Sequence, residues 1–65
     1  MDEKEIMEIC KEVDSLLADY LADSIINKTS YDVLEARHGI VPSSRRNFYR
    51  RRGKVLQIMQ SRKEN

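Results

Sequence analysis

The sequence predicts an all-α fold of three helices, and two observations predict it. Only two Gly and one Pro occur in 65 residues, so few turns are available and the elements between them must be long. Apolar residues recur at three- and four-residue steps, and no segment alternates apolar and polar residues for long enough to form a strand. We expect one domain over residues 1–65.

The first expected helix covers residues 3–26. Its apolar side chains fall on one stripe, made of Ile6, Ile9, Cys10, Val13, Leu16, Leu17, Tyr20, Leu21 and Ile25, with Ser24 among them. Acids crowd its first turn, where the helix dipole favours them. A helix of this length runs on the order of 35 Å, which is long for so small a domain. A break near Leu17–Leu21 is therefore the alternative.

The second expected helix is short and covers residues 31–38. The "NKTS" stretch before it supplies a stop for the first helix and a hydroxyl N-cap for the second. Gly39 follows the helix and is expected to form a left-handed cap. In such a cap, Ile40 folds back toward Leu34.

The third expected helix runs from about Ser44 to Gln60, after a turn at Pro42. Ser43 or Ser44 supplies its N-cap, and "SRKEN" is expected to fray as a polar tail. This helix holds six of the twelve basic residues of the chain within ten positions, 45–54, with no acid among them.

The net charge of +1 conceals two oppositely charged halves. Residues 1–27 carry eight acids and two bases, a net charge of −6, and residues 28–65 carry ten bases and three acids, a net charge of +7. The overall charge therefore says little about binding, and the basic half is the one suited to an anionic partner.

In helical projection, the third helix has an apolar side and a basic side. Phe48, Val55 and Met59 centre the apolar side. The opposite side presents Arg46, Asn47, Arg50, Lys54 and Gln57, with Arg51 at its flank. Arg45 and Arg52 fall near the apolar side, where we expect them to lie along it or to pair with acids of the first helix. Arg forms paired hydrogen bonds with guanine edges, and Asn and Gln do so with adenine edges.

The stretches "SYDVLEARHGI" and "SSRRNFYRRR" resemble the helix-turn-helix superfamily, and in particular small phage and mobile-element regulators, resolvases and the DNA-binding region of sigma factors. The matching positions are Ser30, Tyr31, Leu34, Gly39, Ile40, Phe48, Tyr49, Arg50 and Arg51. The turn between Gly39 and Phe48 is longer than the common pattern of the family. The resemblance implies a three-helix bundle in which helices two and three, residues 29–60, form the helix-turn-helix, while the acidic residues 1–27 serve as scaffold or dimerisation helix.

The resemblance also implies sequence-specific binding of double-stranded DNA by a small regulator of a phage or mobile element, with the third helix in the major groove. We expect Arg46, Asn47 and Arg50 to read bases. Arg45, Arg51 and Lys54 are expected on phosphates, with Ser43 and Ser44 beside them at the start of the helix. If all six cations of residues 45–54 met phosphate, the logarithm of affinity would fall with the logarithm of salt with a slope of roughly −5.

Other interpretations stay open. One is that the basic side of the third helix is solvated and pairs with the acidic first helix. Another is that the chain is a protein-interaction module, such as a small inhibitor of a host or partner protein. RNA is a further candidate for an anionic partner. A chain this small is also a candidate homodimer through residues 3–26, where apolar residues fall at seven-residue steps.

Composition argues against several other classes of function. One Cys and one His provide neither an internal disulfide nor the ligands of an ordinary metal site. No motif pairs a nucleophile with a base, so we expect no enzyme and no cofactor. No apolar run approaches the length of about 18 residues that a membrane span needs, so we expect a cytoplasmic protein without membrane contact.

Overall fold

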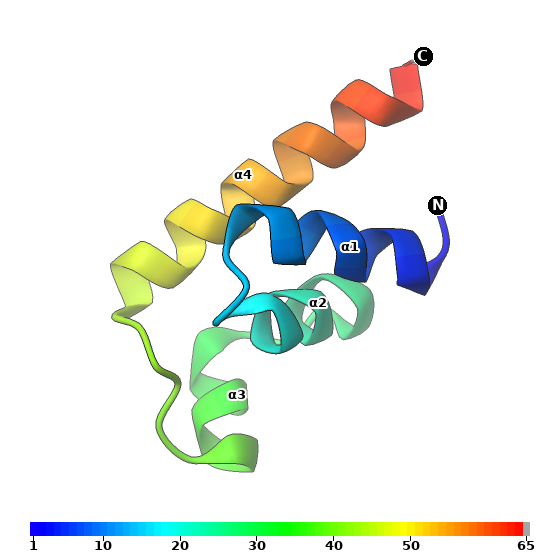
Figure 1. Cartoon of the computed structure of the whole chain (residues 1–65). Helices are drawn as coiled ribbons and strands as arrows, with labels where there is room; N and C mark the ends of the chain where they lie inside the picture. Colours follow the sequence, from blue (N-terminus) through cyan, green and yellow to red (C-terminus); the bar gives the residue numbers. More distant parts are fainter. Residues whose placement is uncertain (65) are drawn as a thin grey trace.

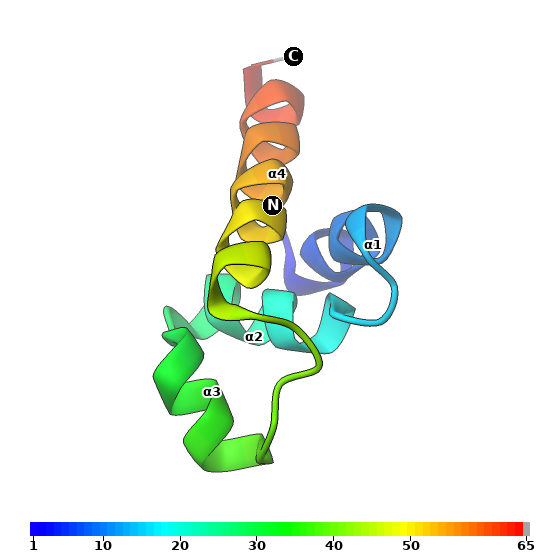
Figure 2. The same ribbon diagram turned by 90° about the vertical axis from the view of Figure 1, so that its left-hand side faces the viewer.

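The computed structural model describes residues 1–64, which form four helices and no strand. They are α1 (Glu3–Val13), α2 (Ala18–Asn27), α3 (Tyr31–His38) and α4 (Arg45–Glu64). The long α4 lies across one side of the molecule, with α1 beside it and α2 below (Figure 1). Figure 2 shows α2 in the middle of the fold, where it packs against each of the other helices. The all-helical class is confirmed, with four helices in place of the expected three.

The expected single helix over residues 3–26 is interrupted between Val13 and Ala18. Asp14 ends α1 in an extended conformation, and its carboxylate Oδ1 accepts hydrogen bonds from the backbone N–H of Leu16 at 3.1 Å and of Leu17 at 3.2 Å. Because these bonds satisfy donors at the start of α2, they stabilise the turn that folds α2 back onto α1. The break therefore lies just before the segment where a break was the alternative.

All four helices and the last connection contribute to one hydrophobic core. Its fully buried side chains include Ile9, Leu21, Leu34, Phe48 and Val55, each 0% exposed. The apolar stripe of residues 3–26 is thus largely buried within the chain. A homodimer through those residues stays a prediction, and it would have to use the acidic, exposed sides of α1 and α2.

The bounds predicted for the second helix are those of α3. The hydroxyl of Ser30 caps it by accepting a hydrogen bond from the N–H of Val33 at 3.3 Å. Gly39 ends it with φ 83° and ψ −141°, which carries the chain away from the helix instead of around its end. The expected left-handed cap is wrong, because this ψ lies outside the left-handed helical region. The expected return of Ile40 toward Leu34 is wrong as well, since Ile40 is 88% exposed. The following residue, Val41, enters the core in its place.

The start predicted for the third helix is right and its end is wrong. α4 begins at Arg45, where Ser44 Oγ accepts the N–H of Asn47 at 3.2 Å, but the helix continues through the tail to Glu64. Arg62 Nη2 lies 3.3 Å from Glu12 Oε2 of α1, an exposed ion pair between the last turns of α4 and α1. The expected fraying of the tail is wrong for residues 61–64, which are helical, and Asn65 lies outside the described residues.

Candidate nucleic-acid interface

The start of α4 is held in place by aromatic side chains. Phe48 is fully buried, and its ring lies edge-on to Tyr31 and Tyr49, with 5.5 Å between ring centroids in both pairs. The hydroxyl of Tyr31 donates to the carbonyl of Ser43 at 2.6 Å, and the hydroxyl of Tyr49 accepts the N–H of Tyr31 at 3.1 Å. Because these bonds join α3, the connection and α4, the first turns of α4 have a fixed position relative to the core.

Ser43, Ser44 and Asn47 form a polar cap at that start. Besides the bond of its N–H to Ser44, Asn47 donates one side-chain amide hydrogen to Ser43 Oγ at 2.9 Å. Asn47 is half-buried, and its amide oxygen and second amide hydrogen have no partner among the described residues. The three residues expected at the N-terminal end of the reading helix thus lie together.

Two arginines of the basic run are held by carboxylates. Arg45 forms an ion pair with Asp32 and lies over the ring of Tyr31, 5.5 Å from its centroid. Arg51 Nε lies 3.7 Å from Asp14 Oδ2. Arg45 therefore pairs with an acid of α3, where an acid of the first helix was expected. Arg51, expected on phosphate, is the residue of the run that meets an acid from the N-terminal half.

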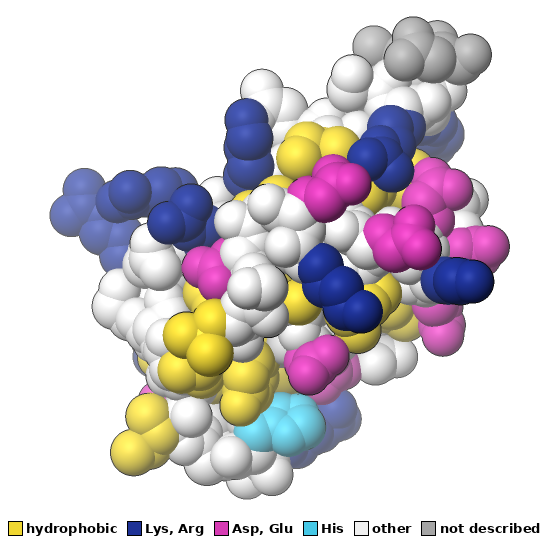
Figure 3. Space-filling view, in the orientation of Figure 1, with side chains coloured by type: hydrophobic (Ala, Val, Ile, Leu, Met, Phe, Trp, Pro, Cys, Tyr) yellow, Lys and Arg dark blue, Asp and Glu magenta, His cyan; other side chains and the backbone are white. Residues whose placement is uncertain are grey.

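Arg46, Arg50 and Lys54 are exposed and have no ion-pair partner in the part of the chain that the structure describes. They recur at four-residue steps and so lie in one row along α4. The row extends on the order of 12 Å, similar to the width of the major groove of B-DNA. Dark-blue side chains gather at the left edge of Figure 3, over the first half of α4.

Along this row α4 has a shallow hollow of about 430 Å³, lined by Arg50, Arg51, Gly53, Lys54 and Gln57. A Cβ placed on Gly53 would meet no atom within 4 Å, so the backbone of α4 is openly accessible there. The row of cations, the hollow and the amide of Gln57 form the surface that we call the basic face.

The acids lie mainly on the other side of the molecule. In Figure 3, magenta side chains cover the right-hand part, over α1, with scattered basic residues between them. The carboxyl of Asp23 belongs to a separate polar group on α2: its pKa is lowered by a hydrogen bond from Asn27 and also by His38 and Arg37. None of these groups covers the row of Arg46, Arg50 and Lys54 by an ion pair.

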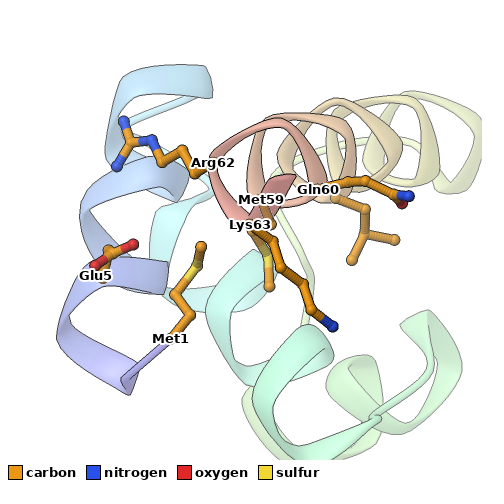
Figure 4. Close-up of a pocket in the computed structure, with 7 residues that line it drawn as sticks. Met1, Glu5, Met59, Gln60, Arg62 and Lys63 are labelled. Atoms are coloured by element: carbon orange, nitrogen blue, oxygen red, sulfur yellow. The ribbon is translucent and has the colours of Figure 1, made fainter. Parts of the chain in front are cut away.

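A groove of about 1030 Å³ lies between the N-terminal end of α1 and the C-terminal half of α4. Figure 4 shows Met1 and Met59 directed into the space between the two helices. Leu56 is 38% exposed at its wall, and charged side chains flank it, namely Glu5, Arg62 and Lys63. The lining of this groove mixes apolar and polar side chains, and the groove lies far from the first turn of α4.

Sequence reasoning missed a third hollow, of about 550 Å³, where α2, the α2–α3 connection and α4 meet. Ser24, Lys28 and Arg52 are among the residues that line it. Lys28 lies directly after α2 and before the hydroxyl cap of α3. That position, a cation between two successive helices, was the available signal. We call this region the interhelix hollow.

Comparison with known proteins returned no match: no family model, no curated protein and no solved structure matches this chain. No helix of the described residues is both long and apolar enough to cross a membrane. Within the same residues, no group of three His, Cys, Asp or Glu side chains is placed to hold a metal ion.

Proposed function

We propose that this protein binds double-stranded DNA with the basic face of α4 in the major groove, as a small helix-turn-helix regulator of a phage or mobile element. The observation that carries the proposal is the exposed row of Arg46, Arg50 and Lys54, which has no ion pair in residues 1–64 and stands on a helix fixed at its start. In this proposal α3 and α4 are the two helices of the motif, and α1 and α2 support them.

The roles of the individual residues follow from their partners. Arg46 and Arg50 read guanine edges, because their guanidinium groups are uncommitted. Asn47 reads an adenine edge with its amide oxygen and its second amide hydrogen, because its hydrogen bond to Ser43 uses only one amide hydrogen. Lys54 contacts phosphate. Arg45 contributes less than expected from the sequence, because an ion pair must first be exchanged.

A salt titration with random-sequence duplex is the first experiment. On such a duplex no base is read, so Arg46, Arg50 and Lys54 are each expected to neutralise one phosphate charge. The slope of log affinity against log salt is then about −3, whereas six cations would give roughly −5. A slope near zero, or no binding at low salt, would refute the proposal.

Two neighbouring arginines offer a matched comparison of variants. Arg50→Ala and Arg46→Ala are each expected to weaken binding to a selected duplex by about 1–3 kcal/mol. Arg51→Ala removes the same side chain one position along, but that side chain already pairs with Asp14, so the loss is expected to be smaller. Far-ultraviolet circular dichroism checks that all three variants keep the helical fold. If Arg46→Ala and Arg50→Ala bind as the parent does, the assignment of the reading face is wrong.

The target sequence is identified with the parent protein by capturing genomic DNA. Fragmented genomic DNA is captured at two salt concentrations and sequenced, and the reading model expects enrichment of a common motif that persists at the higher salt. Capture that is uniform across the genome would leave only nonspecific DNA binding.

The groove between α1 and α4 is the observation that favours the rival class, a protein-interaction module. Its lining combines apolar side chains with charged ones, as in many protein interfaces. Binding by such a module would not depend on Arg46 or Arg50, and random duplex DNA would show no salt-sensitive affinity. The salt titration therefore separates the two classes.

A further inference from the structure

We infer that the interhelix hollow is a phosphate-binding site, built mainly by Arg52 and Lys28. It lies beside the basic face and uses none of the residues assigned there to base reading. The chemistry is that of a phosphate group. Only the source of that phosphate, a backbone phosphate of bound DNA, rests on the proposed function.

The first observation concerns the guanidinium of Arg52. Its Nε donates to the hydroxyl of Ser24 at 2.9 Å, and Ser24 is fully buried and donates in turn to the carbonyl of Thr29 at 2.6 Å. Arg45, Arg51 and Arg62 all meet carboxylates, but Arg52 is half-buried and has no acid within ion-pair distance among the described residues.

A neutral hydroxyl orients this guanidinium but leaves its charge uncompensated. Withdrawing a charge from water is unfavourable unless an opposite charge replaces the lost solvation. The terminal nitrogens of Arg52 have no acceptor in the described part of the chain. A fixed, partly desolvated guanidinium with a free fork is well suited to bind an oxyanion through two hydrogen bonds.

The second observation is a second cation at the same hollow. Lys28 lines it, and no acidic residue does. Its backbone has φ 54° and ψ 44°, and it is the one residue other than glycine with a positive φ among those described. Gly or Asn is the usual occupant of such a helix end, because other side chains are strained there. Lys28 therefore occupies a position where glycine would be more stable.

Two hydroxyl groups complete the donors at the hollow. The hydroxyl of Tyr49 accepts the N–H of Tyr31, and that of Ser30 accepts the N–H of Val33, so both oxygens are oriented while their own hydrogens have no acceptor among residues 1–64. Two cations and two hydroxyl donors match the charge and the several acceptor oxygens of a phosphate.

The position of the hollow suits a strand that borders the groove occupied by α4. At about 100° per residue, Tyr49 lies about 100° around α4 from Arg50, on the flank of the row, whereas Arg52 lies about 160° from Arg50 and reaches the hollow from farther round the helix. A helix that points one side at base edges brings its flank to the neighbouring sugar–phosphate backbone. We therefore assign the hollow to a backbone phosphate, with free inorganic phosphate as the other source of the same group.

The test uses the whole chain and two variants, Lys28→Gly and Arg52→Gln. In the first arm, affinity for random duplex DNA is measured over a range of salt. Each variant is expected to reduce the steepness of the salt dependence by about 0.9 and to weaken binding about 5- to 10-fold near 0.1 M salt, equally for all sequences. Lys11→Gln, on α1, is the matched control and is expected to change neither.

Lys28→Gly keeps the test interpretable if Arg52→Gln fails to fold. Glycine relieves the strained backbone at this position, so the variant is expected to unfold at a temperature equal to or above that of the parent. A purely structural role for Lys28 predicts no loss of DNA affinity from a more stable protein. Weaker binding together with unchanged or higher stability thus points to the ammonium group itself.

The second arm is a nuclear magnetic resonance titration of ¹⁵N-labelled protein with inorganic phosphate, against sodium chloride at equal ionic strength. Saturable shifts of the Arg52 Nε–H and the Lys28 amide resonances, absent in Lys28→Gly, support the site. They support it even if duplex DNA does not bind. In that case the proposed function is wrong and free phosphate is the source. The same shifts with unaltered DNA binding of both variants also assign the site to free phosphate.

Two outcomes overturn the inference. If the parent binds duplex DNA, both variants bind with the same affinity and salt slope, and phosphate causes no shift, the hollow is not a phosphate site and the proposed function stands. If the parent neither binds DNA nor responds to phosphate, both proposals are wrong.

Discussion

The buried hydroxyl of Ser24 joins α2, the α2–α3 connection and α4, and its removal is the sharpest test of how this fold is held together. Ser24→Ala leaves two groups without a partner, the carbonyl of Thr29 and the Nε of Arg52. An unsatisfied buried group costs about 1–3 kcal/mol, and the half-exposure of Arg52 places its share at the lower end. We therefore expect Ser24→Ala to lower the free energy of unfolding by about 2–4 kcal/mol.

That loss is a large part of the total, because a chain of this size has a stability of about 3–10 kcal/mol. Urea unfolding followed by circular dichroism measures it as a lower midpoint with an unchanged slope. A cycle with Arg52→Gln isolates the bond between the two side chains, for which we expect an interaction energy of about 1 kcal/mol. Ser61→Ala, exposed on α4, is the control and should stay within about 0.5 kcal/mol of the parent. A similarly small effect of Ser24→Ala, or strict additivity in the cycle, would refute this account.

Three further predictions concern the backbone and two titratable groups. Gly39→Ala should destabilise the protein by about 1 kcal/mol, because φ at Gly39 is 83°. Gly53→Ala, in the open interior of α4, should stabilise it by about 0.5–1 kcal/mol. The two variants should shift the urea midpoint in opposite directions, and shifts of the same sign would contradict both predictions. The hydrogen bond from Asn27 lowers the pKa of Asp23 below its usual 3.8, so Asp23 contributes stability that is present above that pH and is lost as pH falls below it. The difference in unfolding free energy between parent and Asp23→Asn should therefore shrink between pH 6 and about pH 3, and a constant difference would speak against the ionised group. Burial raises the pKa of the Cys10 thiol to about 11. A thiol reagent at about pH 8 should therefore react promptly with Cys10 only in denaturant. Fast labelling of the folded chain would contradict this prediction and show that the core opens.

Local signals in the sequence predicted those helix ends that local bonds determine. The limits of α3 follow from the hydroxyl of Ser30 and the positive φ of Gly39, and both residues lie next to the helix ends that they determine. The same holds for the start of α4 at its serine pair. Where a cap and a breaker lie within a few residues of each other, the sequence alone suffices.

The break before α2 was misplaced because the apolar stripe runs through it without interruption. Leu16 and Leu17 keep the helical spacing, yet Leu17 is buried and Leu16 is 69% exposed. The deciding group is the carboxylate of Asp14, which bonds to the backbone two and three residues on. The Asp–Ser pair at that point is a turn signal, but the sequence-based prediction gave more weight to the periodicity of the apolar stripe.

The candidate site was predictable in direction but not in its pairing. A helical projection shows which side of α4 faces outward, and it placed Arg46, Arg50 and Lys54 there. It contains no information about which acid lies opposite Arg45 or Arg51, since those contacts join residues far apart in the chain. The interhelix hollow was missed for the same reason, because it exists only once α2, the α2–α3 connection and α4 have met.

The segregation of charge between α1 and the first half of α4 gives the molecule an electric dipole moment. A polyanion exerts a torque on such a particle before contact, turning its cationic pole inward. In the proposed complex with DNA, the anionic pole of a bound copy then points to solvent and repels the same pole of a second copy arriving alongside. Occupancy of neighbouring sites on one duplex should for this reason be anticooperative at low ionic strength and become independent as counterions screen the repulsion over about 10 Å.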